Sequence, residues 1–171
     1  AIGYVIGHEI GHAFDDKGRA FDPYGKLNDW WTAEDSAHFE RAAAKLVEQY
    51  NAFSPLPGMT VNGKLTLGEN IADLTGVTIA WRAYRASLHG KEAPVIDGLT
   101  GDQRFFIGFA QANRASMRDE MLRSLLVSDP HSPARFRVIG VLRNFTPFYE
   151  AFGVKEGDGM YLPPDQRVKI W

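Results

Sequence analysis

The spacing of apolar side chains along the chain predicts a mostly helical protein. An apolar run opens the chain and predicts a helix from Ala1 to about Asp16, ended at Gly18. Residues that favour helix starts or ends predict further helices over 32–50, 69–88, 100–127 and 146–153. Residues 136–141 mix the periods of helix and strand, so the pattern leaves the structure of 134–145 open.

Turn residues between these helices predict two small β-hairpins. The sequence Asp-Pro-Tyr-Gly at 22–25 is typical of a turn and indicates a short hairpin over 19–29. Asn62-Gly63 lies between apolar residues, which is typical of a two-residue hairpin turn, and this hairpin would lead directly to Glu69. The expected fold class is therefore mainly α with small β-hairpins.

Composition narrows the function classes. The chain has 171 residues, 44% of them hydrophobic, which suits a single domain (1–171) with a substantial core. The net charge of −2 gives no reason to expect a nucleic-acid partner, and no apolar run approaches the roughly 18 residues of a membrane span. Cysteine is absent, which excludes disulfides and thiol chemistry. Aromatic residues at helical spacing are expected to form core rather than a substrate pocket. They are Trp30, Trp31, Phe105, Phe106, Phe109, Phe145, Phe148 and Phe152.

The sequence His8-Glu9-Ile10-Gly11-His12 is the strongest chemical signal in the chain. On a helix, His8 and His12 share one face, so both imidazoles can bind one Zn²⁺. Glu9 projects beside that face, where a carboxylate can act as general base on a water molecule. The alternative is a helix with two surface histidines, or with two histidines bonded to neighbouring carbonyls.

Two histidines are too few for a catalytic zinc, which usually has three protein ligands. The best third ligand is Glu69, in the first turn of a predicted helix, with Asp73 one turn further along the same face. Asp73 could accept the free N–H of a ligating histidine and fix its tautomer. Alternatively, Glu69 only stabilises the helix dipole and Asp73 is solvated. The histidine motif favours the metal site.

Three segments in order resemble the C-terminal catalytic region of the neprilysin family of zinc metallopeptidases: Gly7–Trp31, Gly68–Asp73 and Asp129–Gly140. The resemblance covers nearly the whole chain. It implies the α-helical half of a thermolysin-like zincin (gluzincin) catalytic subdomain, with one Zn²⁺ per chain and peptide substrates. The animal members have a cysteine near the C-terminus that this chain lacks, which indicates a bacterial relative.

The resemblance also implies residue roles. The zinc ligands would be His8, His12 and Glu69, and the general base Glu9. Asp73 would orient His8, and either Asp15 or Asp16 would hold His12. His131 would stabilise the oxyanion and Arg137 would bind a substrate carbonyl. These two roles are physically reasonable, because amide hydrolysis builds negative charge on the carbonyl oxygen and a guanidinium donates two parallel hydrogen bonds.

The first helix starts without a capping residue, so we expect the chain to be the C-terminal, zinc-binding fragment of a larger peptidase. Its partner would then be the missing N-terminal domain of the same polypeptide, with no membrane contact from this segment. An extracytoplasmic location is favoured. Two functions are open: a zinc-dependent endopeptidase or oligopeptidase, or an isolated zinc-binding or structural fragment that is inactive because its substrate-binding part is missing.

Overall fold

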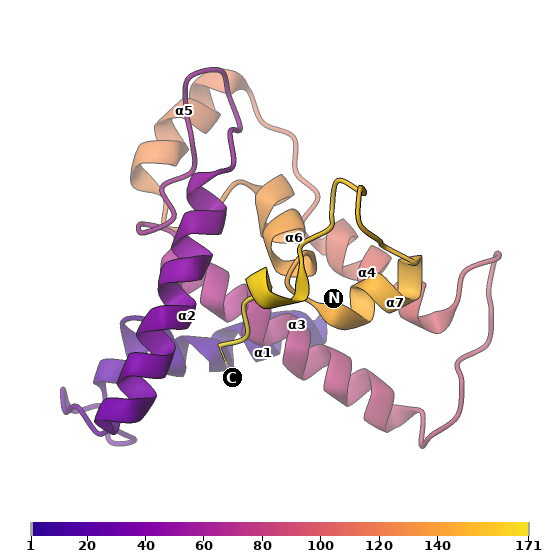
Figure 1. Ribbon diagram of the computed structural model, residues 1–171, viewed down its shortest axis with the longest axis horizontal. Coiled ribbons are helices and arrows are strands. Elements are labelled where there is room, and N and C mark those ends of the chain that lie inside the picture. The colour runs from indigo at the N-terminus through magenta and orange to yellow at the C-terminus, as the bar shows by residue number, and fades with distance from the viewer. Residues whose placement is uncertain (1, 171) are drawn as a thin grey trace.

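Helices make up most of the computed structural model, which describes residues 2–170 (Figure 1). The α-helices are α1 Ile2–Gly11, α2 Ala33–Asn51, α3 Leu67–Ser87, α4 Gly101–Ala112, α5 Asp119–Ser128, α6 Ala134–Leu142 and α7 Thr146–Phe152. Short 3₁₀ turns are η1 His12–Phe14, η2 Gly18–Ala20 and η3 Pro164–Gln166. The mainly helical prediction is confirmed. The predicted helix start at Ala1 lies outside the described residues.

The two predicted β-hairpins are not seen as paired strands: an antiparallel bridge, Phe21–Leu27, closes the first predicted turn, and within 2–170 no bridge spans Asn62-Gly63. Over 2–170 the only β pairing is isolated bridges, at Phe21–Leu27, Leu56–Met59 and Ile96–Leu99. The turn at 22–25 does form, because the Asp22 side chain accepts hydrogen bonds from two backbone N–H groups and Gly25 has a φ of 74°. The preceding residues, however, form η2 rather than a strand.

At Asn62-Gly63 the chain turns directly into α3. The Asn62 side chain accepts a hydrogen bond from the backbone N–H of Leu65, and the Gly63 N–H donates to the side chain of Asn51. A Cβ on Gly63 would lie 2.3 Å from the Val47 carbonyl oxygen. The glycine is therefore needed for close approach to α2, and not for a hairpin turn.

The first helix is shorter than predicted. α1 ends at Gly11, and the chain continues through η1 to Asp15, whose side chain accepts hydrogen bonds from the N–H groups of Lys17 and Gly18. Gly18 is not a helix cap. It packs against the backbone of His12, where an added Cβ would lie 1.8 Å from the carbonyl oxygen.

The predicted helix over 100–127 is two helices. The capping box of Thr100 and Gln103 begins α4 as predicted, but α4 ends at Ala112 and α5 starts only at Asp119. The Asn113 side chain donates a hydrogen bond to the Phe109 carbonyl oxygen at the C-terminal end of α4. Neither glycine nor proline occurs in 113–118, so the usual signal for a break is missing.

Other local signals are confirmed. Thr32 caps α2 by accepting the N–H of Asp35, and Gly153 ends α7 with a φ of 64°. The segment left open, 134–145, contains α6.

The core lies around α3, which α1, α2 and α6 contact. Ile71 and Val77 of α3 are fully buried, together with Tyr50 of α2 and Val141 of α6. The aromatic residues are mostly core, as predicted, although Trp30 is 47% and Phe152 41% exposed. No helix within 2–170 combines the length and apolarity that crossing a bilayer requires.

Candidate metal centre

Glycines let α1 and α3 cross at backbone contact. A Cβ on Gly76 of α3 would lie 2.7 Å from the carbonyl oxygen of Tyr4 and 2.8 Å from the backbone nitrogen of His8. Gly7 and Gly11 of α1 face α3 in the same way, with added Cβ atoms 3.0 Å and 3.1 Å from their nearest neighbours. This approach brings the histidine face of α1 to the first turns of α3.

The two histidines and Glu69 converge. His8 Nε2 lies 3.1 Å from His12 Nε2 and 3.2 Å from Glu69 Oε2, and His12 Nε2 lies 3.6 Å from the same oxygen. In the part of the chain that the structure describes, this is the one group of three potential ligands whose donor atoms all lie within 4.8 Å of each other.

The geometry fits a zinc ion. Ligand atoms at about 2.0–2.1 Å from a tetrahedral zinc are roughly 3.3 Å apart, close to the separations found here. Glu69 Oε2 is buried and accepts no well-formed hydrogen bond from the described residues, although three imidazole nitrogens surround it. The three ligand atoms therefore surround a common centre at which one ion could bind.

The electrostatics also favour a cation. Burial alone would lower the pKa of His8, but the carboxylates of Asp73 and Glu69 outweigh burial and raise that pKa to about 9. Burial would raise the pKa of Glu69, yet the close contact with the His8 imidazole and the charge of His131 lower it. The carboxylates of Asp73 and Glu69 thus place negative charge beside His8, where it would also stabilise a bound cation.

Each imidazole has a carboxylate on its other nitrogen. His8 Nδ1 lies 2.7 Å from Asp73 Oδ1, and His12 Nδ1 lies 2.7 Å from Asp15 Oδ2. Of the two candidates for the partner of His12, the structure places Asp15 there. Asp16 Oδ1 is instead buried next to Gly68, without a hydrogen-bond partner among the described residues.

Glu9 is exposed and lies beside the converging ligands. It lines a hollow of about 250 Å³ together with His8, His131 and Arg137. A water molecule or a substrate carbonyl could enter this hollow from solvent. Glu9, which the sequence predicts as the general base, thus shares a solvent-open hollow with His8.

His131 reaches the same centre from the loop between α5 and α6. Its Nε2 lies 3.1 Å from Glu69 Oε2, its Nδ1 lies 2.8 Å from Asp129 Oδ1, and its side chain is 44% exposed. The adjacent Ser132 donates a 2.8 Å hydrogen bond to the side chain of Asn70, the residue after Glu69. This bond, which the sequence did not suggest, fixes the loop to the start of α3.

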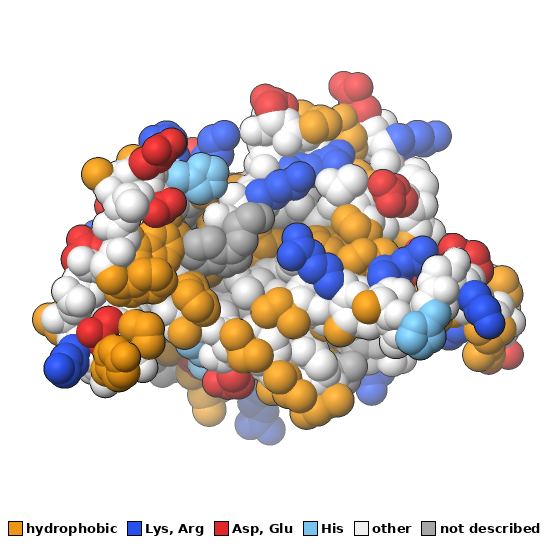
Figure 2. All heavy atoms as spheres, turned by 90° about the horizontal axis from the view of Figure 1, so that it is seen from below, with side chains coloured by type: hydrophobic (Ala, Val, Ile, Leu, Met, Phe, Trp, Pro, Cys, Tyr) orange, Lys and Arg blue, Asp and Glu red, His pale blue; other side chains and the backbone are white. Residues whose placement is uncertain are grey.

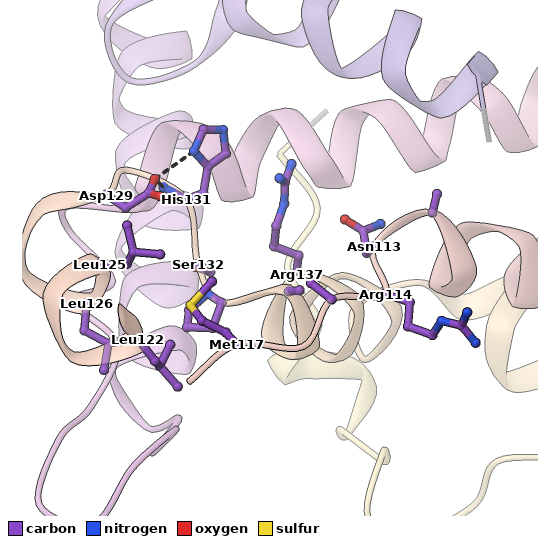
Figure 3. Close-up of a pocket in the computed structure, with 14 residues that line it drawn as sticks. Asn113, Arg114, Met117, Leu122, Leu125, Leu126, Asp129, His131, Ser132 and Arg137 are labelled. Carbon is purple, nitrogen blue, oxygen red and sulfur yellow. Dashed lines mark hydrogen bonds and ion pairs between the residues drawn. The ribbon is translucent and has the colours of Figure 1, made fainter. Parts of the chain in front are cut away.

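Arg137, predicted to bind a substrate carbonyl, forms a two-bond pair with Asp73. Its Nε and Nη2 donate to the two oxygens of Asp73 at 2.7 Å and 2.6 Å, and the carboxylate is completely buried. Figure 3 shows Arg137 extending between His131 and Asn113 along a pocket of about 260 Å³ that all three line. The pairing holds the pKa of Asp73 below its usual range despite burial.

Tyr4 belongs to this network and was missed in the sequence. Its hydroxyl donates to Asp73 Oδ1 and accepts a 3.2 Å hydrogen bond from Arg137 Nη2. Burial and the neighbouring Asp73 raise the pKa of Tyr4, so the hydroxyl stays protonated. The available signal was its position four residues before His8, on the same face of α1.

The helical fold and this constellation of two histidines, four residues apart, and a glutamate from α3 define the zincin class of metallopeptidases. Comparison with known proteins identifies the family within that class. The sequence model of peptidase family M13 matches residues 1–168. The chain therefore belongs to peptidase family M13, the neprilysin family, as the sequence motifs predicted.

Curated relatives and solved structures agree with this assignment. The chain is 44% identical to human endothelin-converting enzyme 1, over 99% of this chain and 22% of that protein. It is 39% identical to Neprilysin-3 of Drosophila melanogaster, over 100% of this chain and 22% of that protein. The structure of Mycobacterium tuberculosis zinc metalloprotease Zmp1 in complex with inhibitor is 51% identical, with a TM-score of 0.98, over 100% of this chain and 27% of that one. The chain thus spans about a quarter of the length of these relatives.

Proposed function

We propose that residues 1–171 form one domain, the zinc-binding catalytic part of a larger endopeptidase or oligopeptidase. The observation that supports this most directly is the convergence of His8, His12 and Glu69 beside an exposed Glu9. Family membership gives the zinc chemistry its general support. The finer proposal is that one Zn²⁺ binds per chain, held by these three residues.

Zn²⁺ bound there would supply a Lewis acid that lowers the pKa of water and polarises the scissile carbonyl. Glu9 takes a proton from the attacking water as the new C–O bond forms. The same carboxylate then gives that proton to the leaving nitrogen as the C–N bond breaks. His131 donates an N–H to the carbonyl oxygen as negative charge develops on it, and Arg137 binds a second substrate carbonyl.

The carboxylates behind the ligands position them. Asp73 holds His8 by its Nδ1, and Asp15 holds His12 in the same way, so that both Nε2 atoms are available for the metal. Asp73 also holds Arg137, and thereby connects the metal ligand with the substrate-binding group.

Replacing Glu9 with glutamine in the intact polypeptide tests the mechanism. Peptide turnover should fall by roughly 10²–10⁴-fold, because the amide cannot take the proton, whereas zinc content should stay unchanged. Glu48→Gln, at an exposed position on α2, is the matched control and should retain full activity. Undiminished turnover in a fully zinc-loaded Glu9→Gln protein would refute the assignment.

The outer face of α1 supports the proposal that the domain has a partner within the same polypeptide. Ile2, Val5, Ile6 and Ile10 are all exposed on this helix. Figure 2 shows hydrophobic side chains gathered in a band along the lower edge of the view. Contiguous exposed apolar surface usually marks an interface. We propose that the N-terminal domain covers it, and that the larger protein acts outside the cytoplasm, as the family resemblance implies.

The second candidate function is a zinc-binding fragment without activity, which the exposed α1 face favours for the chain in isolation. Peptide cleavage and zinc content should be measured on the 171-residue chain and on the intact polypeptide. Zinc binding by both, with cleavage only by the intact polypeptide, is the expected result. Cleavage by the isolated chain at the full rate would show that the rest of the polypeptide is dispensable.

A further inference from the structure

The hydroxyl of Tyr4 forms hydrogen bonds with both Asp73 and Arg137 beside the candidate metal centre. Asp73 Oδ1 faces three donors at once: His8 Nδ1 at 2.7 Å, Arg137 Nη2 at 2.6 Å and the Tyr4 hydroxyl. The hydroxyl also accepts from Arg137 Nη2. Tyr4 thus closes a ring of hydrogen bonds with Asp73 and Arg137.

This ring determines which part of the guanidinium is left for other partners. Arg137 Nε donates to Asp73 Oδ2, and Nη2 donates to both Asp73 Oδ1 and Tyr4. Within residues 2–170, Nη1 makes no hydrogen bond, and Arg137 lines both hollows next to the metal centre. Two N–H groups on Nη1 are therefore available to a ligand that enters there.

Packing alone does not explain the tyrosine. Its ring is buried and meets Phe109 edge-on, with centroids 4.8 Å apart, and a phenylalanine would make the same contact. The hydroxyl adds no apolar contact, and burying it is favourable only because it is hydrogen-bonded, to Asp73 and Arg137 among others. The Tyr4 hydroxyl therefore contributes through the ring of hydrogen bonds with Asp73 and Arg137.

We propose that Tyr4 is a positioning residue for substrate binding: together with Asp73 it fixes the rotation of the Arg137 guanidinium, so that Nη1 faces a peptide carbonyl. This inference rests on the proposed peptidase function. Tyr4 does not touch the substrate in this scheme and acts only through Arg137. It lies on α1 together with His8, one of the proposed metal ligands, so the substrate-binding group and the zinc site share one support.

The first test is Tyr4→Phe in the intact, zinc-loaded polypeptide. Arg137 binds the substrate carbonyl before and during the reaction, so KM for a peptide should rise by roughly three- to tenfold with little change in kcat. Zinc content should not change. Tyr149→Phe is the matched control: it removes another buried hydroxyl, one that bonds to the Arg143 carbonyl oxygen, and should leave KM unchanged.

A double-mutant cycle separates positioning from a general structural effect. In an Arg137→Gln background, Tyr4→Phe should produce no further rise in KM, because the group through which it acts is gone. An equal rise in both backgrounds would overturn the proposal. So would a Tyr4→Phe protein whose KM matches that of the native protein.

A readout without turnover keeps the inference distinct from the proposed function. Nitrogen-15 NMR on arginine-labelled, zinc-loaded protein measures rotation of the Arg137 guanidinium about its Nε–Cζ bond. Rotation should be faster in Tyr4→Phe than in the native protein and unchanged in Tyr149→Phe. If the native polypeptide cleaves no peptide, the proposed function fails, while the rotation rates still decide whether Tyr4 holds Arg137. Equal rates in Tyr4→Phe and native protein would overturn that role.

Discussion

The imidazoles of His8 and His12 each contact a carboxylate on the nitrogen that faces away from the proposed metal position. Asp73, the partner of His8, is completely buried, and Asp15, the partner of His12, is nearly so. Such carboxylates fix the tautomer and raise the basicity of a ligating histidine. The distinction between Asp15 and the adjacent Asp16 is therefore testable through metal affinity.

Asp15→Asn should weaken zinc binding by about 10–100-fold. Its remaining oxygen can still accept the backbone N–H groups of Lys17 and Gly18, but an amide nitrogen would then face His12 Nδ1. Asp16→Asn is the neighbouring control and should leave the zinc dissociation constant unchanged. Calorimetric titration with zinc measures the dissociation constant of both variants. An equal loss of zinc affinity in the two would contradict the assignment of Asp15 as the partner of His12.

The sequence predicted these site residues to different extents. The spacing of His8 and His12 follows from helix geometry, so the converging pair was predictable, and Glu69 followed from the need for a third ligand. Tyr4 was not predictable in this way, because an aromatic residue in an apolar run is usually core. Nor could spacing choose between Asp15 and Asp16, since that choice depends on η1 after Gly11.

At the scale of elements, the site depends on how closely α1 and α3 cross. Gly76 packs against the backbone of α1, where no side chain could move aside to make room for a methyl group. The separation of the two helices thus controls the distance from the histidines to Glu69.

Gly76→Ala should push the helices apart, destabilise the fold by about 1–3 kcal/mol and weaken zinc binding. Gly108→Ala in α4 is the matched control, since its Cβ would meet nothing within 4 Å. That substitution should leave zinc affinity unchanged and stabilise the helix by up to about 1 kcal/mol. Thermal unfolding and zinc titration measure both effects. Native zinc affinity in Gly76→Ala would show that the crossing tolerates more distance than the structure indicates.

Elements with local signals were predictable, and those set by distant contacts were not. Thr32, Thr100 and Gly153 mark helix ends through bonds to nearby backbone, and each lies where predicted. The early end of α1 has no such mark, and at the break after Ala112 the only mark is the Asn113 side chain bonded to the Phe109 carbonyl oxygen, without a glycine or proline in 113–118. The hairpin turn predicted at Asn62-Gly63 does not form, because Gly63 is needed for close packing against α2. In the sequence such a glycine cannot be told from one that is needed for a turn.

For the molecule as a whole, the metal would join helices that are distant in sequence. In the proposed site His8 lies in α1, His12 in the adjoining η1 and Glu69 in α3, so zinc would bind only where all three elements are in place. Ligand binding to the folded state alone stabilises it by mass action.

Zinc at 100 times its dissociation constant should stabilise the 171-residue chain by about 2.7 kcal/mol, or roughly 5–10 °C in Tm. A chelator should reverse the shift. In Glu69→Gln, which leaves two histidine ligands and keeps the side chain nearly isosteric, the zinc-dependent shift should be much smaller. Calorimetry on both proteins, with and without zinc, provides the measurement. An equal zinc-dependent Tm shift in the native chain and in Glu69→Gln would show that the metal binds at another site.

The contact between α1 and α3 has a consequence for biosynthesis. A ribosome makes α1 well before α3, and a domain generally folds as a unit once its parts have been synthesised. Until α3 has left the exit tunnel, the nascent segment with His8 and His12 has neither its packing surface nor Glu69. Metal binding at the proposed site would therefore have to follow the emergence of α3, and a chain truncated before α3 would expose an apolar segment suited to chaperone capture.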